Sequence, residues 1–532
     1  GLFQPGDHVI TTVLEHNSVL RPLYWCQEQG VELTILNCDE KGNLSYEEME
    51  NAVRKNTKAI VCTHASNVTG DGNDIAQIGT LCEKYNLYFI LDASQTAGTA
   101  GINMEQDHIS AICFTGHKGL FGPQGTGGIA LADGVCVKPL LSGGSGVHSF
   151  ERKHPMELPA ALEAGTLNGH GIAGLHAALD WIKKTGIAAI HEKEMALAEQ
   201  FQRGIETIPG IHLYGGEKRV AAIVSCNLAD LDSAYVSDCL AEDYGIATRA
   251  GVHCAPLMHT HFGTEKQGMV RFSFSCFNTT EEVEKAVRAM QDIAAENRGK
   301  VTAYVGAGGK TSSIRKRAET LRAEGKRVLI LTTTKMMVPQ EQEIFAAYEQ
   351  TGQESVISAT ASVWQERRAA EKQLKERVQS VLDTYGCCVA GSLIPGTEKF
   401  GMLPEKLMED LLYLADEILI EADGSAHMPV KAPAEHEPVL FPYMDEVVIV
   451  MGAHAIGKPL QKVCHRVDYA KKILKCDADK IVTAADIRAL AEQGYAIPIQ
   501  KQFPWMKISK VTGKDIKLCL TAEKKDKVRD KQ

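Results

Sequence analysis

Short β-rich runs alternate with charged, amphipathic segments along this chain, and this alternation limits the folds open to it. In the N-terminal part, the runs Val31–Leu36, Ala59–Cys62 and Tyr88–Leu91 are separated by helical stretches such as Ser45–Lys55. Strands that alternate with helices form a mostly parallel sheet with helices packed on it. We therefore predict an α/β fold with a large parallel-sheet domain at residues 1–205.

A polar, glycine-bearing hinge at residues 296–300 marks the main predicted boundary. After it the pattern restarts with a strand at 301–305, a glycine loop, a helix at 312–322 and a strand at 327–331. Such a βαβ opening is typical of nucleotide-binding folds. The predicted division is a large domain at 1–205, a small α/β domain at 206–297, a linker at 298–301 and a P-loop-like α/β domain at 302–532. Residues 475–532 show no pattern that predicts a function.

Composition argues against two classes of partner. The chain carries 57 Lys and Arg against 67 Asp and Glu, for a net charge of −10. Sequence-independent nucleic-acid binding needs a basic surface, and no apolar run approaches the ~20 residues of a membrane helix. The 15 cysteines show no disulfide or zinc spacing, which is typical of reduced thiols in a cytoplasm. We therefore expect a cytoplasmic protein that binds neither nucleic acid nor membrane.

Asp92 and Lys118 suggest a cofactor site. Lys118 lies in the glycine-rich run Thr115–Leu120, and Asp92 follows a strand at 89–91. A lysine becomes nucleophilic when burial or nearby cations lower its pKa. An acid at the carboxyl end of a buried strand faces the ligand crevice, where it can pair with a protonated pyridine nitrogen. The alternatives are a surface lysine and a helix N-cap, but the two intervening glycine loops favour the cofactor site.

Two further polar groups follow predicted strands. His16 lies in the run Glu15–Ser18, and Asn67 ends the run His64–Asn67. An imidazole can stack on a planar ring, and a carboxamide can hydrogen-bond to a ring oxygen. Each alone is more often an ordinary buried polar residue, but four polar groups at the strand ends of one sheet indicate a ligand site.

The polar residues of this region resemble, in order and spacing, those of the fold-type I, class V aminotransferases. They are His16, Asn67, Asp92, Gln95, Thr115, His117 and Lys118. Two later segments, Glu163–Asn168 and Arg249–Pro256, narrow the resemblance to cysteine desulfurases of the NifS/SufS type, including selenocysteine-lyase-like members. The resemblance covers residues 1–297 and implies the pyridoxal-phosphate-dependent transferase fold of type I.

The resemblance implies how pyridoxal 5'-phosphate would be held. Lys118 would bind the cofactor covalently and move protons, Asp92 would keep the pyridine nitrogen protonated, and His16 would stack on the ring. The remaining contacts would come from Gln95 and Asn67 on the ring hydroxyl side, and from Thr115 and His117 on the phosphate.

The same resemblance implies the substrate and the partners. Arg271 would bind the carboxylate of L-cysteine or L-selenocysteine, since a planar guanidinium can donate two parallel hydrogen bonds to a carboxylate. Arg249 and Asn67 would assist it. Thr166 would reach the cofactor of a second subunit, which implies a homodimer. The sulfur or selenium would pass to an acceptor protein.

Cys254 is the candidate nucleophile. Its thiolate would attack the sulfur of the substrate and become a persulfide, with alanine as the other product, and His253 and Arg249 would favour the thiolate. Other cysteines in apolar contexts are interpreted as ordinary buried thiols: Cys62, Cys113, Cys226 and Cys276.

Two alternatives to this function stay open. One is another class V transaminase or lyase without persulfide chemistry. The other is an inactive scaffold, because the family's fold begins with elements, including a Thr/Gly-rich phosphate loop, that precede the segment at Leu2. We therefore expect the N-terminal part of the large domain to be missing.

The second chemical motif is the run VGAGGKTS at residues 305–312. Backbone N–H groups of a glycine loop that opens a helix form an anion cradle. Lys310 would reach the phosphates of ATP or GTP, and Thr311 would coordinate Mg²⁺. Tyr304 stands where a full Walker A motif has its first glycine, so a plain glycine turn is the alternative. The predicted nucleotide-binding residues are Gly306, Gly308, Gly309, Lys310, Thr311 and Ser312.

Asp423 is the second candidate Mg²⁺ ligand, because it follows the apolar strand 417–420. The alternative is a charged turn. The next loop, residues 427–438, holds His, Lys and Glu between prolines and is typical of a ligand-facing loop.

Residues 302–470 resemble the YqeC-like accessory proteins of selenium-dependent hydroxylases. Besides the glycine loop, the segments Leu331–Met336 and Gly452–Gly457 carry this resemblance. It implies a nucleotide-binding factor for maturation of a selenium-dependent molybdenum hydroxylase. A lyase that mobilises sulfur or selenium, fused to such a factor, predicts that the chalcogen serves this maturation.

Overall fold

Parallel strands build the first sheet, as the alternation of strands and helices predicts. The computed structural model describes residues 2–349 and 361–512, which divide into a unit up to Ile293 and a unit from Ala294. The strands of the first sheet are β1 (His8–Thr12), β2 (Glu32–Leu36), β3 (Thr57–Thr63), β4 (Tyr88–Asp92), β5 (Ala111–Thr115) and β6 (Gly127–Leu131). Their order is β2-β1-β3-β4-β5-β6, and β6 pairs antiparallel with β5.

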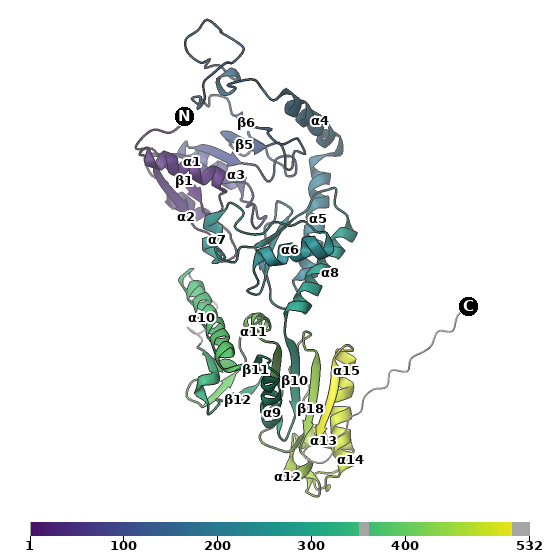
Figure 1. Ribbon diagram of the computed structural model, residues 1–532. Coiled ribbons are helices and arrows are strands. Elements are labelled where there is room, and N and C mark those ends of the chain that lie inside the picture. The colour runs from purple at the N-terminus through teal and green to yellow at the C-terminus, as the bar shows by residue number, and fades with distance from the viewer. Residues whose placement is uncertain (1, 350–360, 513–532) are drawn as a thin grey trace, which may run out of the picture. The chain divides into compact units, whose positions relative to one another are not determined.

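Amphipathic helices connect these strands and cover the sheet (Figure 1). The N-caps Ser45 and Asp74 accept hydrogen bonds from the first turns of α2 and α3, which satisfies N–H groups that a helix start leaves free. Val9, Leu23 and Val61 belong to one buried cluster under α1. The helices are α1 (Asn17–Glu28), α2 (Tyr46–Asn51), α3 (Ile75–Tyr85), a 3₁₀ turn (Ala160–Leu162), α4 (Gly169–Thr185) and α5 (Ile187–Ile205).

A three-stranded antiparallel sheet completes the first unit. Its strands are β7 (Ile211–Tyr214), β8 (Ile223–Leu228) and β9 (Val270–Ser273), in the order β7-β8-β9. Phe201 of α5 packs on Phe272 of β9 with ring centroids 4.3 Å apart. The helices of this region are α6 (Ser233–Tyr244), α7 (Pro256–Phe262) and α8 (Thr280–Asn297). Together with the first sheet, this arrangement confirms the predicted α/β class.

The second unit contains a nine-stranded mixed sheet. Strands β11, β16, β10, β18 and β20 follow one another across this sheet and are parallel. The order is β12-β15-β14-β11-β16-β10-β18-β20, with β13 beside β14. The strands are β10 (Lys300–Gly306), β11 (Val328–Thr332), β12 (Lys335–Met337), β13 (Phe345–Tyr348), β14 (Cys387–Leu393), β15 (Lys399–Gly401), β16 (Glu417–Glu421), β18 (Glu446–Met451) and β20 (Lys507–Thr512); β17 (Val430–Lys431) and β19 (Cys464–His465) pair separately.

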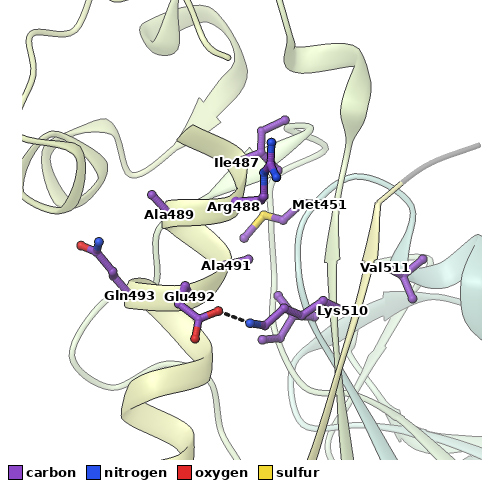
Figure 2. A pocket seen from close by; sticks show the side chains of 10 residues that line it. Met451, Ile487, Arg488, Ala489, Ala491, Glu492, Gln493, Lys510 and Val511 are labelled. Carbon is purple, nitrogen blue, oxygen red and sulfur yellow. Dashed lines mark hydrogen bonds and ion pairs between the residues drawn. The ribbon is translucent and has the colours of Figure 1, made fainter. Parts of the chain in front are cut away.

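The segment 475–512, in which the sequence showed no functional pattern, completes the second sheet. It forms α14 (Ala484–Ala489), a π-helical segment (Leu490–Ala496), α15 (Ile497–Gln502) and the edge strand β20. Between β18, β20 and these helices lies a cavity of about 280 Å³. Lys510 and Glu492 form an ion pair across it (Figure 2). The other helices are 3₁₀ turns (Gln342–Ile344 and Ala453–Ala455), α9 (Lys310–Ala323), α10 (Ala361–Tyr385), α11 (Glu405–Leu411), α12 (Leu460–Val463) and α13 (Val467–Leu474).

Within the described ranges, every helix is too short or too polar to cross a lipid bilayer. The cysteines of those ranges are all free thiols.

Candidate functional site

Asp92 ends β4 at the edge where the parallel strands of the first sheet terminate. Its side chain is buried, and its Oδ1 accepts hydrogen bonds from the Ser94 backbone N–H at 2.9 Å and the Ser94 hydroxyl at 2.5 Å. The strand order places β3 and β5 on either side of β4. Polar groups that follow these strands therefore meet at one edge, as the sequence predicted for a ligand crevice.

Lys118 lies near Asp92 and two arginines. Although its side chain is exposed, loss of water around the ammonium lowers the pKa of Lys118, and Arg271 and Arg249 lower it further. Asp92 acts in the opposite direction. A lysine with a lowered pKa supplies more of the neutral amine that attacks a carbonyl carbon.

His16 is the N-cap of α1 at the same edge. Its Nδ1 accepts from the Ser18 backbone N–H at 3.0 Å, which holds the ring at the helix start. Burial and the Lys118 ammonium lower the pKa of His16. A neutral imidazole results, and a neutral ring stacks on another ring without placing a charge on it.

The other residues expected around the cofactor are Thr115, His117, Gln95 and Asn67. Thr115 Oγ1 and His117 Nδ1 are 2.7 Å apart and hydrogen-bonded to each other, so the two expected phosphate ligands lie side by side. Gln95 is half-buried in the turn after Asp92. The Asn67 amide, expected on the ring hydroxyl, donates instead to the His253 backbone oxygen at 2.8 Å.

Two arginines face each other across an antiparallel bridge. The backbone N–H groups of Arg249 and Arg271 each donate to the other residue's carbonyl, at 3.2 and 2.9 Å. Arg271 Nη1 donates to the Asn67 carbonyl at 3.0 Å. Burial and the charge of Arg249 lower the pKa of Arg271 to about 10. Both guanidiniums remain cations at neutral pH, so together they attract an anion such as a carboxylate.

Cys254 is half-buried beside these arginines, with its Sγ 3.7 Å from Arg249 Nη2. Cys226, by contrast, is fully enclosed, and burial raises its pKa to about 12. The neighbouring His253 differs from expectation. Burial and the nearby Arg271 lower the pKa of His253 to about 3, so its ring is neutral and cannot favour a Cys254 thiolate by charge. Arg249 is the cation that can.

Glu15 is a buried acid that sequence analysis gave no role. Thr12 Oγ1 and the Thr63 N–H donate to its Oε1 at 2.7 and 3.1 Å, and its Oε2 is buried without a partner. Burial raises the pKa of Glu15 to about 8, and Asp92 adds to the rise. Its position directly before His16 was visible in the sequence, but its burial was not.

Thr166 lies on an exposed bend before α4. Its predicted contact with the cofactor of a second subunit stays a prediction. Large apolar side chains in the neighbouring part of the sequence are exposed, including Leu140, Leu141, Phe150, Met156, Leu158, Leu167 and Ile172.

The residues at the edge of the first sheet fit pyridoxal phosphate. The site combines a lysine whose amine is deprotonated more readily than usual, a buried carboxylate for a pyridine nitrogen, and a neutral imidazole. Paired arginines add positive charge for the carboxylate of an amino acid. This set of donors and charges is what a pyridoxal-dependent amino-acid enzyme requires.

The glycine loop of the second unit follows β10 and opens α9, as predicted. Gly306, Gly308 and Gly309 have φ of +92°, +75° and +114°, a region that L side chains rarely adopt. A Cβ at Gly308 would lie 2.5 Å from the Pro429 carbonyl oxygen. Lys310 is buried and its Nζ donates to the Gly306 carbonyl at 2.8 Å; burial lowers its pKa. Ser312 is exposed on the first turn of α9.

Asp423, the predicted second Mg²⁺ ligand, is held by other groups of the protein. It forms a fully buried ion pair with Lys431, and its Oδ2 accepts from Tyr495 Oη at 2.7 Å and the Gly306 N–H at 3.2 Å. Thr311 donates instead to Glu421 at 2.8 Å. Glu421 ends β16, directly beside β10. The same strand-end reasoning that selected Asp423 selects Glu421 once the end of the strand is known.

The two units match different families. Residues 1–286 match the family model described as aminotransferase class-V, and residues 302–468 match that described as YqeC protein. A probable cysteine desulfurase of Methanothermobacter thermautotrophicus is 33% identical over 297 residues, covering 55% of this chain and 74% of that protein. A cysteine desulfurase of Shigella flexneri is 30% identical over 294 residues, covering 54% and 71%.

A solved structure agrees with these sequence relatives. The apo structure of a cysteine desulfurase from Thermococcus onnurineus has a TM-score of 0.52 and 30% identity, covering 55% of this chain and 74% of that one. The predicted resemblances of both halves of the chain are thereby confirmed.

Proposed function

Because this chain belongs to the class-V aminotransferase family, we propose that its first unit is a pyridoxal-phosphate-dependent cysteine desulfurase or selenocysteine lyase. The observation that carries the proposal is the convergence of Lys118, Asp92, Arg271 and Cys254 at one edge of the unit. Bound pyridoxal phosphate supplies an electron sink for the substrate's carbons. The roles of the other groups follow from their places around it.

Arg271 and Arg249 bind and orient the substrate carboxylate, and Lys118 moves the proton at the substrate's α-carbon. The Cys254 thiolate attacks the substrate sulfur, so that an S–S bond forms as the Cβ–S bond breaks. The electron pair of the broken bond stays with the substrate carbon, which takes up a proton and leaves as alanine. No external oxidant is needed, and the persulfide on Cys254 carries the sulfur to an acceptor protein.

Absorbance spectra test the proposal. Purified protein with added pyridoxal phosphate is expected to show a visible band that changes on addition of L-cysteine and is lost in Lys118→Ala. Sulfide release and a Cys254 persulfide, detected by mass spectrometry, should accompany the change. Turnover that persists in Cys254→Ala would indicate a transaminase or lyase without persulfide chemistry. A wild type with neither band nor turnover would indicate an inactive scaffold. Parallel assays with L-selenocysteine compare the two chalcogens.

The proposed enzyme is a homodimer. The support is the set of exposed apolar side chains near Thr166 in the sequence, which includes Leu140 at 85% and Leu141 at 70% exposure. Exposed large apolar side chains gain stability when a second copy covers them, and Thr166 would contact the cofactor phosphate of the second copy. Sedimentation should give a dimer for wild type and a monomer for Leu141→Asp.

For the second unit we propose binding of ATP or GTP with Mg²⁺. The glycine loop offers backbone N–H groups at the start of α9, and Thr311 with Glu421 offers oxygen ligands for the metal. Isothermal titration with each nucleotide tests this, with Lys310→Ala as the variant expected to lose binding. Together with the YqeC match, it supports a role in maturing a selenium-dependent molybdenum hydroxylase, which predicts that deletion of the gene removes the hydroxylase's labile selenium.

A further inference from the structure

The loop that carries Cys254 has a backbone that is unusual for L-amino acids. Gly251, His253 and Cys254 have φ of +93°, +49° and +58°. Glycine adopts these values freely, but residues with a Cβ do so at a cost. Two consecutive non-glycine residues in this region persist only where the surroundings fix them. The loop therefore needs anchors.

Two hydrogen bonds hold the carbonyls of these residues. Asn67 Nδ2 donates to the His253 oxygen at 2.8 Å, and the Asn17 backbone N–H donates to the Cys254 oxygen at 2.8 Å. Asn17 begins α1 directly after His16. The loop is thus tied to the same strand ends that hold the proposed cofactor residues.

The His253 ring is a third anchor. It is 1% exposed, and its Nε2 lies 3.1 Å from the Met269 carbonyl oxygen. Because a carbonyl only accepts, Nε2 must carry the proton and donate it. The ring packs near His259, with centroids 5.6 Å apart. Met269 immediately precedes β9, so the ring ties the loop to the strand that carries Arg271.

We propose that His253 is a positioning residue for the Cys254 thiol. The buried His253 ring and the Asn67 amide hold His253 and Cys254 in their left-handed backbone conformation. This keeps the Cys254 Sγ beside Arg249. Its role is mechanical, since the ring bears no charge at neutral pH. Only the consequence for catalysis rests on the proposed desulfurase function, because the placement of Cys254 can be measured without cofactor or substrate.

Site-resolved alkylation tests the inference in the full chain. Iodoacetamide is applied over a range of pH to wild type, His253→Leu and His253→Gln, and modification of Cys254 is followed by mass spectrometry. Cys136, an exposed thiol of the same chain, is the internal reference. Loss of one hydrogen bond should release the loop and raise the limiting rate at Cys254 about fivefold in His253→Leu. His253→Gln, which keeps an N–H donor, should return toward the wild-type rate.

Two results would overturn the proposal. One is an unchanged limiting rate at Cys254 in His253→Leu. The other is a shifted pH midpoint at an unchanged limiting rate in both variants, which would assign His253 an electrostatic role. If His253→Leu proves unfolded by thermal melting, His253→Asn replaces it, because asparagine tolerates the left-handed region and its shorter side chain does not reproduce the ring's anchor.

Kinetics with L-cysteine separate this inference from the proposed function. A wild type that forms no persulfide contradicts the desulfurase, while the alkylation result still decides the role of His253. In an active enzyme, His253→Leu should lower kcat for persulfide formation and leave KM and pyridoxal phosphate affinity near wild type. Loss of cofactor binding in His253→Leu, at an unchanged alkylation rate, would also overturn the positioning role.

Discussion

The two units of this protein each hold charged groups near the carboxyl ends of parallel strands, but these charges are balanced in different ways. In the first unit, the charges of Arg271 and Arg249 lower the pKa of Lys118, and the charge of Arg249 lowers the pKa of Arg271. In the second unit, the cations are paired. Lys431 contacts Asp423 and Glu437, and Lys310 donates to the Gly306 carbonyl.

This difference predicts how each site meets its ligand. Three cations near one another repel, and an anion that enters between them relieves the repulsion, so the first site is preorganised for a negatively charged substrate. In the second, Lys310 must leave an internal hydrogen bond before it reaches a phosphate. The proposed nucleotide binding would therefore be coupled to a rearrangement, which would reduce the net affinity that its contacts provide.

Removal of the nucleophile gives the largest effect and tests whether the first site does persulfide chemistry. Cys254→Ala is expected to lower sulfide release on the order of 10⁴-fold, while the visible cofactor band remains. Cys226→Ala is the matched control, since that thiol is buried with a raised pKa. Sulfide release near the wild-type rate in Cys254→Ala would mean that the first site does not depend on this thiol, and equal loss in both variants would mean that the effect is not specific to it.

Removal of the Lys431 ammonium tests whether cations of the protein itself neutralise the carboxylates of the second site. Lys431 is 0% exposed, so Lys431→Met leaves the buried Asp423 carboxylate without its cation, while Glu437 keeps its ion pair with Arg466. The variant should lose about 4 kcal/mol of unfolding free energy, measured by urea denaturation. Lys431→Met combined with Asp423→Asn should recover part of the loss. A stability equal to wild type would contradict the neutralised network.

Glu15 extends the comparison between the charged groups of the two units, because it is a buried acid without a cation partner. Its pKa is raised from 4.5 to about 8, so the folded state binds the proton more tightly than the unfolded state. The stabilisation is fully present below about pH 4.5 and is lost as pH rises through 8. Between pH 5 and 9, wild type should lose about 4 kcal/mol more stability than Glu15→Gln. Calorimetry that shows parallel pH profiles for the two proteins would refute the buried, protonated state.

The arginine pair should give the smallest effect. Arg271→Lys keeps the charge but replaces the planar fork with a single ammonium. Loss of one charge-assisted hydrogen bond, worth about 2 kcal/mol, should raise KM for L-cysteine roughly 30-fold. Steady-state kinetics at saturating cofactor measure this. An unchanged KM would show that Arg271 does not bind the carboxylate.

Much of the first site was accessible from the sequence, because its residues follow strands that periodic patterns predict well. Asp92 and Lys118 were selected in this way, and their proximity in the structure agrees with that selection. The partners of Asn67 and the neutrality of His253 could not be predicted, since both depend on the Cys254 loop, which lies far along the chain.

In the second unit the sequence predicted the glycine loop but selected Asp423 as the metal ligand. One residue separates Asp423 from Glu421, and only the strand end decides which carboxylate faces Thr311. Tyr495, whose hydroxyl fixes Asp423, belongs to a segment in which no functional pattern was visible. Contacts between residues this far apart depend on the folded arrangement rather than on local patterns.

The sequence by itself determined the α/β class, the two families and the residue types available for chemistry, because these depend on periodicity and on motifs of neighbouring residues. The tertiary structure decided which charges are paired, which acids are buried and which backbone carbonyls hold the Cys254 loop. Those properties depend on the local loss of water and on distances between segments remote in sequence. They set pKa values and geometry, and thereby what the available residues can do.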